Sequence, residues 1–215
     1  TLGARTEMSS KKAAAKGVKS EYIIKAPPYF GERVIGLTFT DEPSKLLNRT
    51  TKVSLYTLTD DPTKQYLLVK FQIVRVTGNT AETIFYGHEY DREYLKSLLR
   101  RGSSRIDGFY DVETADGYRL RVQCTVFTQK RARSGKKTAI RHIMNNVVKA
   151  ESKRLELGQL AQEMVLGKTA SDIYNELKKI LIPRHVGVVK SKVLSKPQQI
   201  AATKEAAATE AMNAT

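Results

Sequence analysis

The stretch from Gln129 to Arg141 holds the residues whose types and spacing most clearly predict chemistry. Six cations and no acid lie there in a polar, glycine-containing segment that leads into a helical pattern: Lys130, Arg131, Arg133, Lys136, Lys137 and Arg141. Such side chains repel one another, and a nearby polyphosphate converts the repulsion into attraction by releasing condensed counterions. Loop N–H groups and the hydroxyl of Ser134 add hydrogen bonds to phosphate oxygens. The stretch therefore predicts RNA contact, with a solvated charged surface as the alternative.

A second glycine-containing segment, Gly167-Lys168-Thr169, superficially resembles a phosphate-binding loop. That loop requires another glycine five residues before its second one and a strand that leads into it. Gln162 stands at that position, and the preceding pattern is helical. We therefore interpret Gly167 as the end of a helix rather than as part of a nucleotide site.

Candidate metal ligands are few, because the three histidines are isolated and the chain has a single cysteine. A tetrahedral zinc site therefore lacks ligands. His88 is followed by Glu89 and Asp91, whose oxygens suit Mg²⁺, so a metal-dependent nuclease centred on these three residues is one alternative function. The pattern lacks the second histidine of a zinc-protease helix. We predict neither a metal site nor a cofactor.

Three acids share one side of a predicted strand, which could suggest acid–base catalysis: Asp107, Asp111 and Glu113. Three arginines lie beside them or opposite them across a predicted hairpin: Arg105, Arg119 and Arg121. Opposite charges that face each other across a hairpin pair readily, so we predict a charge-paired, solvated surface. No Ser-His-Asp or Cys-His pairing is visible from spacing. The sequence predicts a protein without catalytic activity.

The distribution of charge supports a polyanionic partner. The 215 residues include 37 Lys and Arg against 22 Asp and Glu, for a formal net charge of +15. Residues 129–154 hold nine cations and one acid, and the first 25 residues hold six cations and two acids. Phosphate binding requires such clustering, whereas solubility does not. No apolar run approaches the roughly 20 residues that span a bilayer. We expect no membrane partner and a cytoplasmic location.

The elements that position these residues follow from periodicity. Residues 1–21 have no core-forming period and are predicted to form a flexible basic arm with Lys11, Lys12, Lys16 and Lys19. After Pro27-Pro28, six strands are predicted, at residues 33–40, 52–58, 65–77, 80–86, 105–114 and 118–128. Cys124 alternates with apolar neighbours in the last of these, which predicts a buried thiol.

Turn residues and helical spacing predict how these strands connect. Gly78-Asn79 and Asp116-Gly117 favour two antiparallel hairpins. Helices are predicted at 91–101, from Thr138 onward, before Gly167, and from a capping-box-like Thr169-Ala-Ser-Asp172 to Pro183. In the second helix an apolar stripe, Ile140, Ile143, Met144 and Val147, lies beside a polar stripe, Arg141, Asn145, Lys149 and Lys153. Residues 186–194 return to a strand.

These elements predict an α+β fold with one domain. Residues 22–196 form that domain: 22–128 mainly β, 129–183 the basic loop and the helices, and 184–196 the final strand. One short helix is inserted in the sheet region. Residues 197–215 form an Ala-rich tail. Tyr29, Phe30 and Tyr56 could stack on unpaired bases, but we favour packing for each.

Three separated blocks, in order, resemble a known family. They are Ala26–Gly36, Thr114–Arg131 and Ile180–Pro197, and they are similar to the S3Ae family, also called eS1, of archaeal and eukaryotic small-subunit ribosomal proteins. The resemblance runs from about Tyr22 to Pro197. It implies an antiparallel, barrel-like β core with accompanying helices, no catalytic activity, and binding to small-subunit rRNA and neighbouring ribosomal proteins on the platform, near where mRNA leaves. The Ala-rich ending favours an archaeal-type member.

The resemblance also implies site residues. Gln129-Lys130-Arg131 matches the family's basic segment, and Lys190, Lys192 and Lys196 match basic positions of its last strand. We therefore expect a structural constituent of the small ribosomal subunit, located in the cytoplasm within the ribosome, with mRNA near the exit as a further contact. A free RNA chaperone is the first alternative, because the same electrostatics would serve it, and the metal-dependent nuclease is the second. The predicted RNA-binding residues are Lys11, Lys12, Lys16, Lys19, Lys130, Arg131, Arg133, Lys136, Lys137, Arg141, Lys149, Lys190, Lys192 and Lys196.

Overall fold

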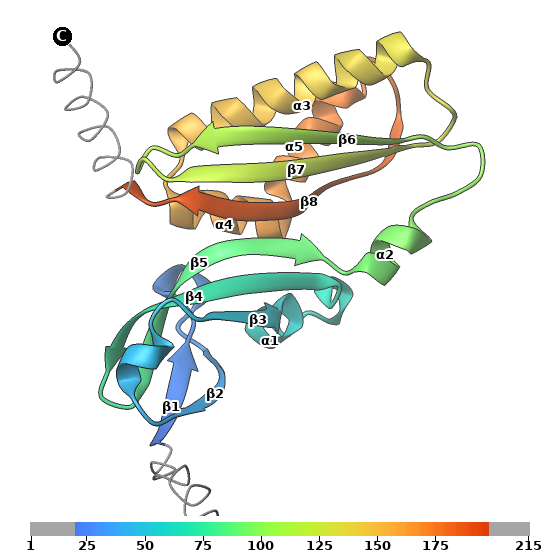
Figure 1. The fold of residues 1–215 in the computed structure, drawn as a ribbon. Coiled ribbons are helices and arrows are strands. Elements are labelled where there is room, and N and C mark those ends of the chain that lie inside the picture. Colours follow the sequence, from blue (N-terminus) through green and yellow to red (C-terminus); the bar gives the residue numbers. More distant parts are fainter. Residues whose placement is uncertain (1–19, 198–215) are drawn as a thin grey trace, which may run out of the picture.

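A computed structural model describes residues 20–197, which form one branched sheet and a layer of helices (Figure 1). Most of the predicted basic arm, residues 1–19, lies outside the described residues, and so does the tail after Pro197. The arm's four predicted RNA-binding residues are among those not described: Lys11, Lys12, Lys16 and Lys19. The strands are β1 (Ser20–Lys25), β2 (Val34–Thr40), β3 (Thr50–Ser54), β4 (Leu67–Thr77), β5 (Thr80–Tyr90), β6 (Arg105–Glu113), β7 (Arg119–Thr128) and β8 (Pro183–Ser195).

Both predicted hairpins are confirmed. β4 and β5 pair antiparallel around Gly78, and β6 and β7 pair antiparallel around Gly117. Gly78 has φ of 58° and Gly117 has φ of 77°, the left-handed conformation that glycine adopts without steric cost. In β4, Leu67, Val69 and Phe71 are buried while the residues between them face the other side. Strand alternation in the sequence therefore sets which face of the sheet packs.

The sheet topology departs in part from the antiparallel, barrel-like core. The strand order is β2-β1-β5-β8-β7-β6, with β4 paired to β5 and β3 paired to β4, and the sheet does not close. Ile23–Lys25 of β1 pair with Thr80–Glu82 of β5 in parallel. β5 pairs with three strands. One of its edges pairs with β4, and the other edge pairs with β1 along its first half and with β8 along its second half. The α+β class and the return to a final strand are confirmed.

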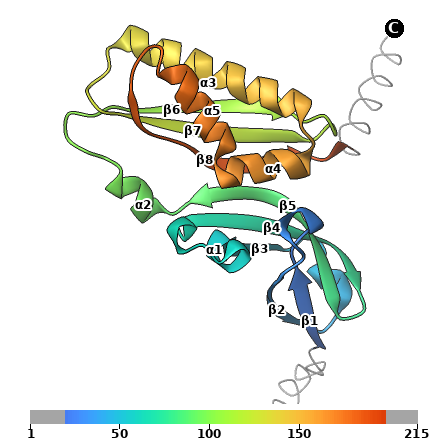
Figure 2. The ribbon, with the colours of Figure 1, turned by 180° about the vertical axis from the view of Figure 1, so that it is seen from behind.

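Three helices cover one face of the β6–β7–β8 part of the sheet: α3 (Ser134–Arg154), α4 (Leu157–Leu166) and α5 (Lys168–Leu177). They lie behind these strands in Figure 1, and α4 and α5 lie in front of them in Figure 2. Ile140, Met144 and Val148 of α3 are buried, as are Ile173 and Leu177 of α5. Each such side chain stabilises the fold by roughly 1.5–3 kcal/mol. Among the described residues, these three helices leave the opposite face of β6–β7–β8 open (Figure 1), and we call it the uncovered face.

Several predicted boundaries are corrected. The strand predicted at 52–58 ends at Ser54, and α1 (Leu55–Thr59) follows. The Ser54 hydroxyl accepts a hydrogen bond from the Tyr56 N–H at 3.3 Å, while Leu55 and Leu58 are buried at helical spacing. Ser54 therefore caps a helix instead of continuing the strand. β1 was not among the predicted strands, and β5 extends past Tyr86 to Tyr90.

The short helices also differ in detail. α2 (Arg92–Ser97) is shorter than the predicted 91–101. α5 begins directly after Gly167, which ends α4 as predicted, with φ of 97°. Thr169 is therefore buried inside α5 and makes no capping bond, contrary to the predicted capping box. The remaining elements are 3₁₀ turns: η1 (Pro28–Phe30), η2 (Pro43–Leu46) and η3 (Pro62–Lys64).

One carboxylate is buried between the helices. Glu151 of α3 is 6% exposed, and neither of its carboxylate oxygens has a hydrogen-bond partner among residues 20–197. Burial is the largest cause and raises the pKa of this carboxyl; the nearby Thr169 hydroxyl acts in the opposite direction, and Asp172 and Glu163 raise the pKa further. The folded state therefore resists ionisation of Glu151, whereas the unfolded state does not.

Glu151→Gln is expected to raise the melting temperature at pH 7 by about 2–4 °C, the equivalent of about 1 kcal/mol in a chain of this size. The ionised carboxylate destabilises the fold above the usual pKa of 4.5, and this penalty disappears as pH falls below that value. The difference between variant and parent should therefore shrink at pH 4 in thermal unfolding. Glu156→Gln, at an exposed position, is the matched control. A lower melting temperature for Glu151→Gln at pH 7 would show that the Glu151 carboxylate stabilises the fold, contrary to this prediction.

Candidate nucleic-acid interface

The predicted basic segment is held by its backbone and presents its side chains outward. Lys130 and Arg131 connect β7 to α3, and Arg133 stands at the N-cap of α3. The Thr128 hydroxyl donates to the Lys130 carbonyl at 2.7 Å. The Ala132 N–H donates to the hydroxyl of Ser104 at 3.1 Å, and Ala132 is buried. The connection is therefore anchored to the sheet, which keeps its cations in a defined place.

The electrostatics of this segment favour an anion. Within residues 20–197, none of its five cations from Lys130 to Lys137 forms an ion pair, and four of them are exposed, with Lys137 half-buried. The first turn of α3 contains no acid, and no side chain caps it. The unpaired N–H groups and the positive end of the helix dipole therefore add to the cationic charge. A phosphate at this position would relieve the repulsion.

Arg141 and Lys149 lie farther along α3. Arg141 contacts β6, whereas Lys149 points into solvent. The Arg141 Nε–H donates to the carbonyl of Asp107 at 3.1 Å, and the Tyr110 hydroxyl donates to the Arg141 carbonyl at 2.8 Å. Arg141 therefore ties α3 to β6, a role that spacing alone did not predict. Lys149 is exposed and forms no ion pair within the part of the chain that the structure describes.

The predicted cations of β8 lie on the uncovered face of the sheet. Lys190 and Lys192 are exposed there, and Lys196 is half-buried at the end of the strand. Cross-strand pairing joins Lys192 to Arg121 of β7 and to Gly87 of β5. The same register continues from Gly87 to Lys70 of β4 and from Lys70 to Lys52 of β3. The fold thus assembles a row of four cations across five strands, which we name the cation row: Lys52, Lys70, Lys192 and Arg121.

Sequence reasoning missed most of the cation row. Lys52 and Lys70 fall in two separate predicted strands, 52–58 and 65–77, and no local pattern relates them. Their alignment with Lys192 depends on the β5–β8 pairing, which joins segments about a hundred residues apart. Arg100 and Arg101 were also missed, because they fall in a region predicted as helix; both are exposed after α2, in the connection that leads to Ser104.

The predicted charge-paired surface on the β6–β7 hairpin is confirmed. Arg121 makes a two-pronged pair with Asp111, with nitrogen–oxygen distances of 2.7 and 2.8 Å. These hydrogen bonds hold the pKa of Asp111 below its usual value. The two other predicted pairs are Arg105 with Asp107 at 3.0 Å and Arg119 with Glu113 at 3.3 Å. The three acids are therefore neutralised by arginines instead of forming a catalytic group.

The geometry does not assemble the alternative nuclease centre. His88 is completely buried, and its Nε2–H donates to the carbonyl of Val188 at 2.9 Å, while Nδ1 lies 2.7 Å from the hydroxyl of Ser191. Burial lowers its pKa to about 4, so the ring stays neutral near pH 7. His88 therefore joins β5 to β8 and does not face Glu89 or Asp91. Among the described residues, no group of three or more His, Cys, Asp or Glu could hold a metal ion.

Glu89 instead organises lysines on the uncovered face. Its carboxylate lies 2.6 Å from the Lys70 Nζ, 3.0 Å from the Lys52 Nζ and 3.9 Å from the Lys190 Nζ. Partial burial acts to raise its pKa, but the hydrogen bonds from Lys70 and Lys52 dominate and lower the pKa. One carboxylate therefore holds three cations together, and the cluster keeps a net positive charge.

Of the remaining candidates, Phe30, Tyr29 and Cys124 are packing residues, whereas Tyr56 is exposed. Phe30 packs against Phe71 with ring centres 5.6 Å apart, and the Tyr29 hydroxyl accepts a hydrogen bond from the Phe85 N–H at 2.8 Å. Cys124 is completely buried, which confirms the predicted packed thiol, and this burial raises the pKa of the thiol to about 12. Tyr56 is 48% exposed, so its ring is not part of the core, and a prediction of core packing is wrong for this residue.

None of the described helices combines the length and apolarity needed to cross a membrane.

Comparison with known proteins identifies the family of the chain. Residues 9–197 match the model of the Ribosomal S3Ae family. The protein named small ribosomal subunit protein eS1 from Methanothrix thermoacetophila is 40% identical over 192 residues, which cover 89% of this chain and 91% of that protein. The proteins of the same name from Sulfolobus acidocaldarius and Staphylothermus marinus are 40% and 44% identical; the alignments cover 84% of this chain and 92% and 85% of those proteins. The match spans the sheet, the helices and the basic segment, and the chain belongs to the Ribosomal S3Ae family.

Proposed function

We propose that this protein is a non-enzymatic structural constituent of the small ribosomal subunit and acts in translation by holding folded rRNA. The basic segment from Lys130 to Lys137 carries this proposal, because its anchored backbone presents unpaired cations at the start of α3. The relatives' name, small ribosomal subunit protein eS1, supports the assignment to that subunit. The rigid sheet sets the geometry of the cations, and the cations supply the affinity.

The finer assignment rests on the family resemblance. We propose that the protein lies on the platform of the cytoplasmic ribosome near the mRNA exit, with rRNA and neighbouring ribosomal proteins as partners and mRNA as a further contact. Arg141, Lys149, Lys190, Lys192 and Lys196 extend the RNA surface beyond the basic segment. The N-terminal cations Lys11, Lys12, Lys16 and Lys19 are proposed to join it.

Gradient sedimentation of a cell lysate tests the proposal, with this protein tracked by mass spectrometry. We expect it to migrate with the small subunit at low salt. With roughly six to ten phosphates neutralised, the affinity of the purified protein for its rRNA should fall on the order of a thousandfold or more between 50 and 200 mM salt. A free RNA chaperone would stay near the top of the gradient. That result would overturn the assignment to the ribosome.

A further inference from the structure

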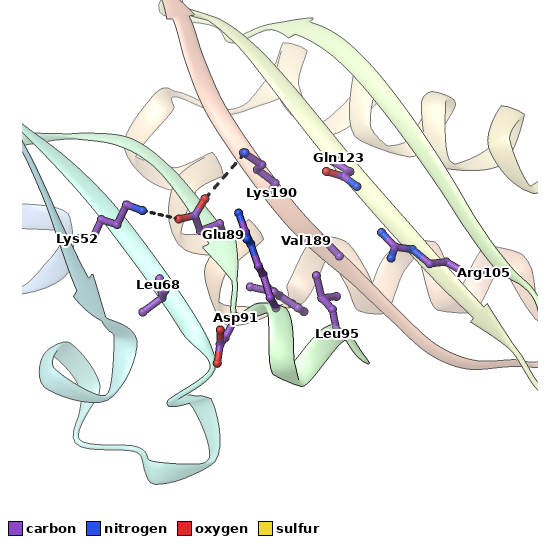
Figure 3. Close-up of a pocket in the computed structure, with 11 residues that line it drawn as sticks. Lys52, Leu68, Glu89, Asp91, Leu95, Arg105, Gln123, Val189 and Lys190 are labelled. Carbon is purple, nitrogen blue, oxygen red and sulfur yellow. Dashed lines mark ion pairs between the residues drawn. The ribbon is translucent and has the colours of Figure 1, made fainter. Parts of the chain in front are cut away.

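The uncovered face of the sheet contains a hollow beside the β5–β8 pairing (Figure 3). Its volume is about 510 Å³, within the range of small-molecule pockets. Its lining comes from β3, β4, β5, α2, β6, β7 and β8. We name it the seam pocket. Its charged lining residues are Lys52, Glu89, Asp91, Arg92, Arg105 and Lys190, and Gln123 adds an amide.

The lining of the seam pocket has more cations than acids, which favours an anion. It holds four cations against Glu89 and Asp91, and one of the four, Arg105, is paired with Asp107. Lys52 and Lys190 converge on Glu89 from opposite sides in Figure 3, and Lys70 satisfies the same carboxylate. Glu89 is therefore neutralised within the cluster. Arg92 is exposed and forms no ion pair with any residue from 20 to 197. A phosphate could therefore bind the unpaired guanidinium of Arg92, beside the lysines that Glu89 holds in place.

The rest of the lining suits a planar heterocycle better than a bare phosphate. Leu68 and Leu95 are half-buried and supply apolar surface, and Gln123 supplies an amide that can both donate and accept hydrogen bonds. In Figure 3 the Leu95 and Gln123 side chains lie on different sides of the hollow. An inorganic phosphate would use the cations alone. A nucleotide would use the apolar surface, the amide and the cations together.

The surroundings favour a nucleotide that is part of a chain. Lys190 and Lys192 are two residues apart on β8, so their side chains leave the same face about 7 Å apart. The cation row continues from Lys192 to Lys70 and Arg121. Lys70 is paired with Glu89 and Arg121 with Asp111, whereas Lys192 is exposed and forms no ion pair within residues 20–197. A backbone that enters the seam pocket therefore meets further cations beside it. A double helix keeps its bases stacked inside and cannot insert one, whereas a single strand can.

We propose that the seam pocket receives one unstacked nucleotide of single-stranded RNA, whose flanking phosphates bind Arg92, Lys190 and the cation row. The base rests on Leu95, and Gln123 hydrogen-bonds to its edge. This proposal deepens the proposed function and rests on RNA being the partner. It adds a site for a single strand to the basic segment, which binds folded rRNA.

Fluorescence anisotropy of the full chain tests it, with labelled hexauridylate, hexaadenylate and an RNA hairpin as probes. The double variant Arg92→Ala/Gln123→Ala should bind at least one hexanucleotide about tenfold or more weakly, as expected for the loss of one base contact, and should bind the hairpin as the parent does. Arg75→Ala, which removes an exposed cation elsewhere on β4, should change neither affinity by more than about twofold. Equal weakening of hexanucleotides and hairpin would overturn the proposal.

Two further measurements do not depend on how the variants fold. A hexanucleotide carrying 4-thiouridine should cross-link to the peptides that contain Leu95, Gln123 or Lys190; cross-links confined to 129–141 would overturn the seam pocket. Polyglutamate of matched charge should displace the hexanucleotide poorly, and equal displacement would identify a site for acidic protein segments instead. Neither result depends on co-sedimentation with the small subunit, so the pocket and the ribosomal assignment can fail separately.

Discussion

Replacement of Lys130, Arg131, Arg133, Lys136 and Lys137 with Gln is expected to weaken binding to structured rRNA by about a hundredfold or more at 100 mM salt. Each cation that contacts a phosphate releases counterions, which gives a slope of about −0.7 to −0.9 per phosphate when log K is plotted against log salt. If each of the five neutralises one phosphate, the slope should become less steep by roughly 3.5–4.5. Filter binding or anisotropy at several salt concentrations measures both quantities.

The fold should tolerate these five changes. The side chains have no ion-pair partners among the described residues, and they crowd the positive end of α3. Removal of like charges at a helix N-terminus is neutral or slightly favourable, so the melting temperature should not fall. The control removes five exposed cations elsewhere: Lys45, Arg49, Arg75, Lys178 and Lys179. It matches the loss of net charge, and its slope should stay close to the parent's. The same slope for both variants would refute the role of the basic segment.

Gly87→Ala is expected to destabilise the fold by about 3 kcal/mol or more, in the upper range for forced overpacking. A Cβ at this position would lie 2.2 Å from the Ser191 carbonyl oxygen and 3.2 Å from the Lys192 Cα. Both are backbone atoms, so no side-chain rotation can make room. β5 and β8 must separate, and their pairing involves only Gly87, His88 and Glu89 of β5.

The same separation would remove the buried bonds of His88. Its two ring nitrogens form hydrogen bonds with the Val188 carbonyl and the Ser191 hydroxyl of β8, and its backbone N–H donates to the Ser191 hydroxyl at 3.1 Å. Urea unfolding should therefore show a lower midpoint for Gly87→Ala, and hexanucleotide binding should weaken because the cation row crosses this pairing. Gly135→Ala is the matched control, since a Cβ there meets nothing within 4 Å in α3. An unchanged midpoint for Gly87→Ala would contradict the close approach of the Gly87 backbone to the Ser191 carbonyl.

Local patterns in the sequence determined most of the elements and one part of the interface. Alternation in β4, the Asp116-Gly117 turn, the helical period after Thr138 and the cluster of cations from Lys130 to Lys137 are properties of short segments. Each depends on residues within a few positions of one another, so periodicity and turn chemistry are sufficient to predict it. The burial of Cys124 follows in the same way from its apolar neighbours on alternate positions.

Tertiary structure alone decided the rest. Whether Ser54 continues a strand or caps a helix depends on the space available to Leu55 and Leu58, and the parallel pairing of β1 depends on which edge of β5 is free. The cation row and the seam pocket exist because Gly87 lets β5 approach β8 in one register. A shift of one residue would turn these lysines to the opposite face. Register between distant strands is set by packing on both sides of the sheet, and no single segment of the sequence records it.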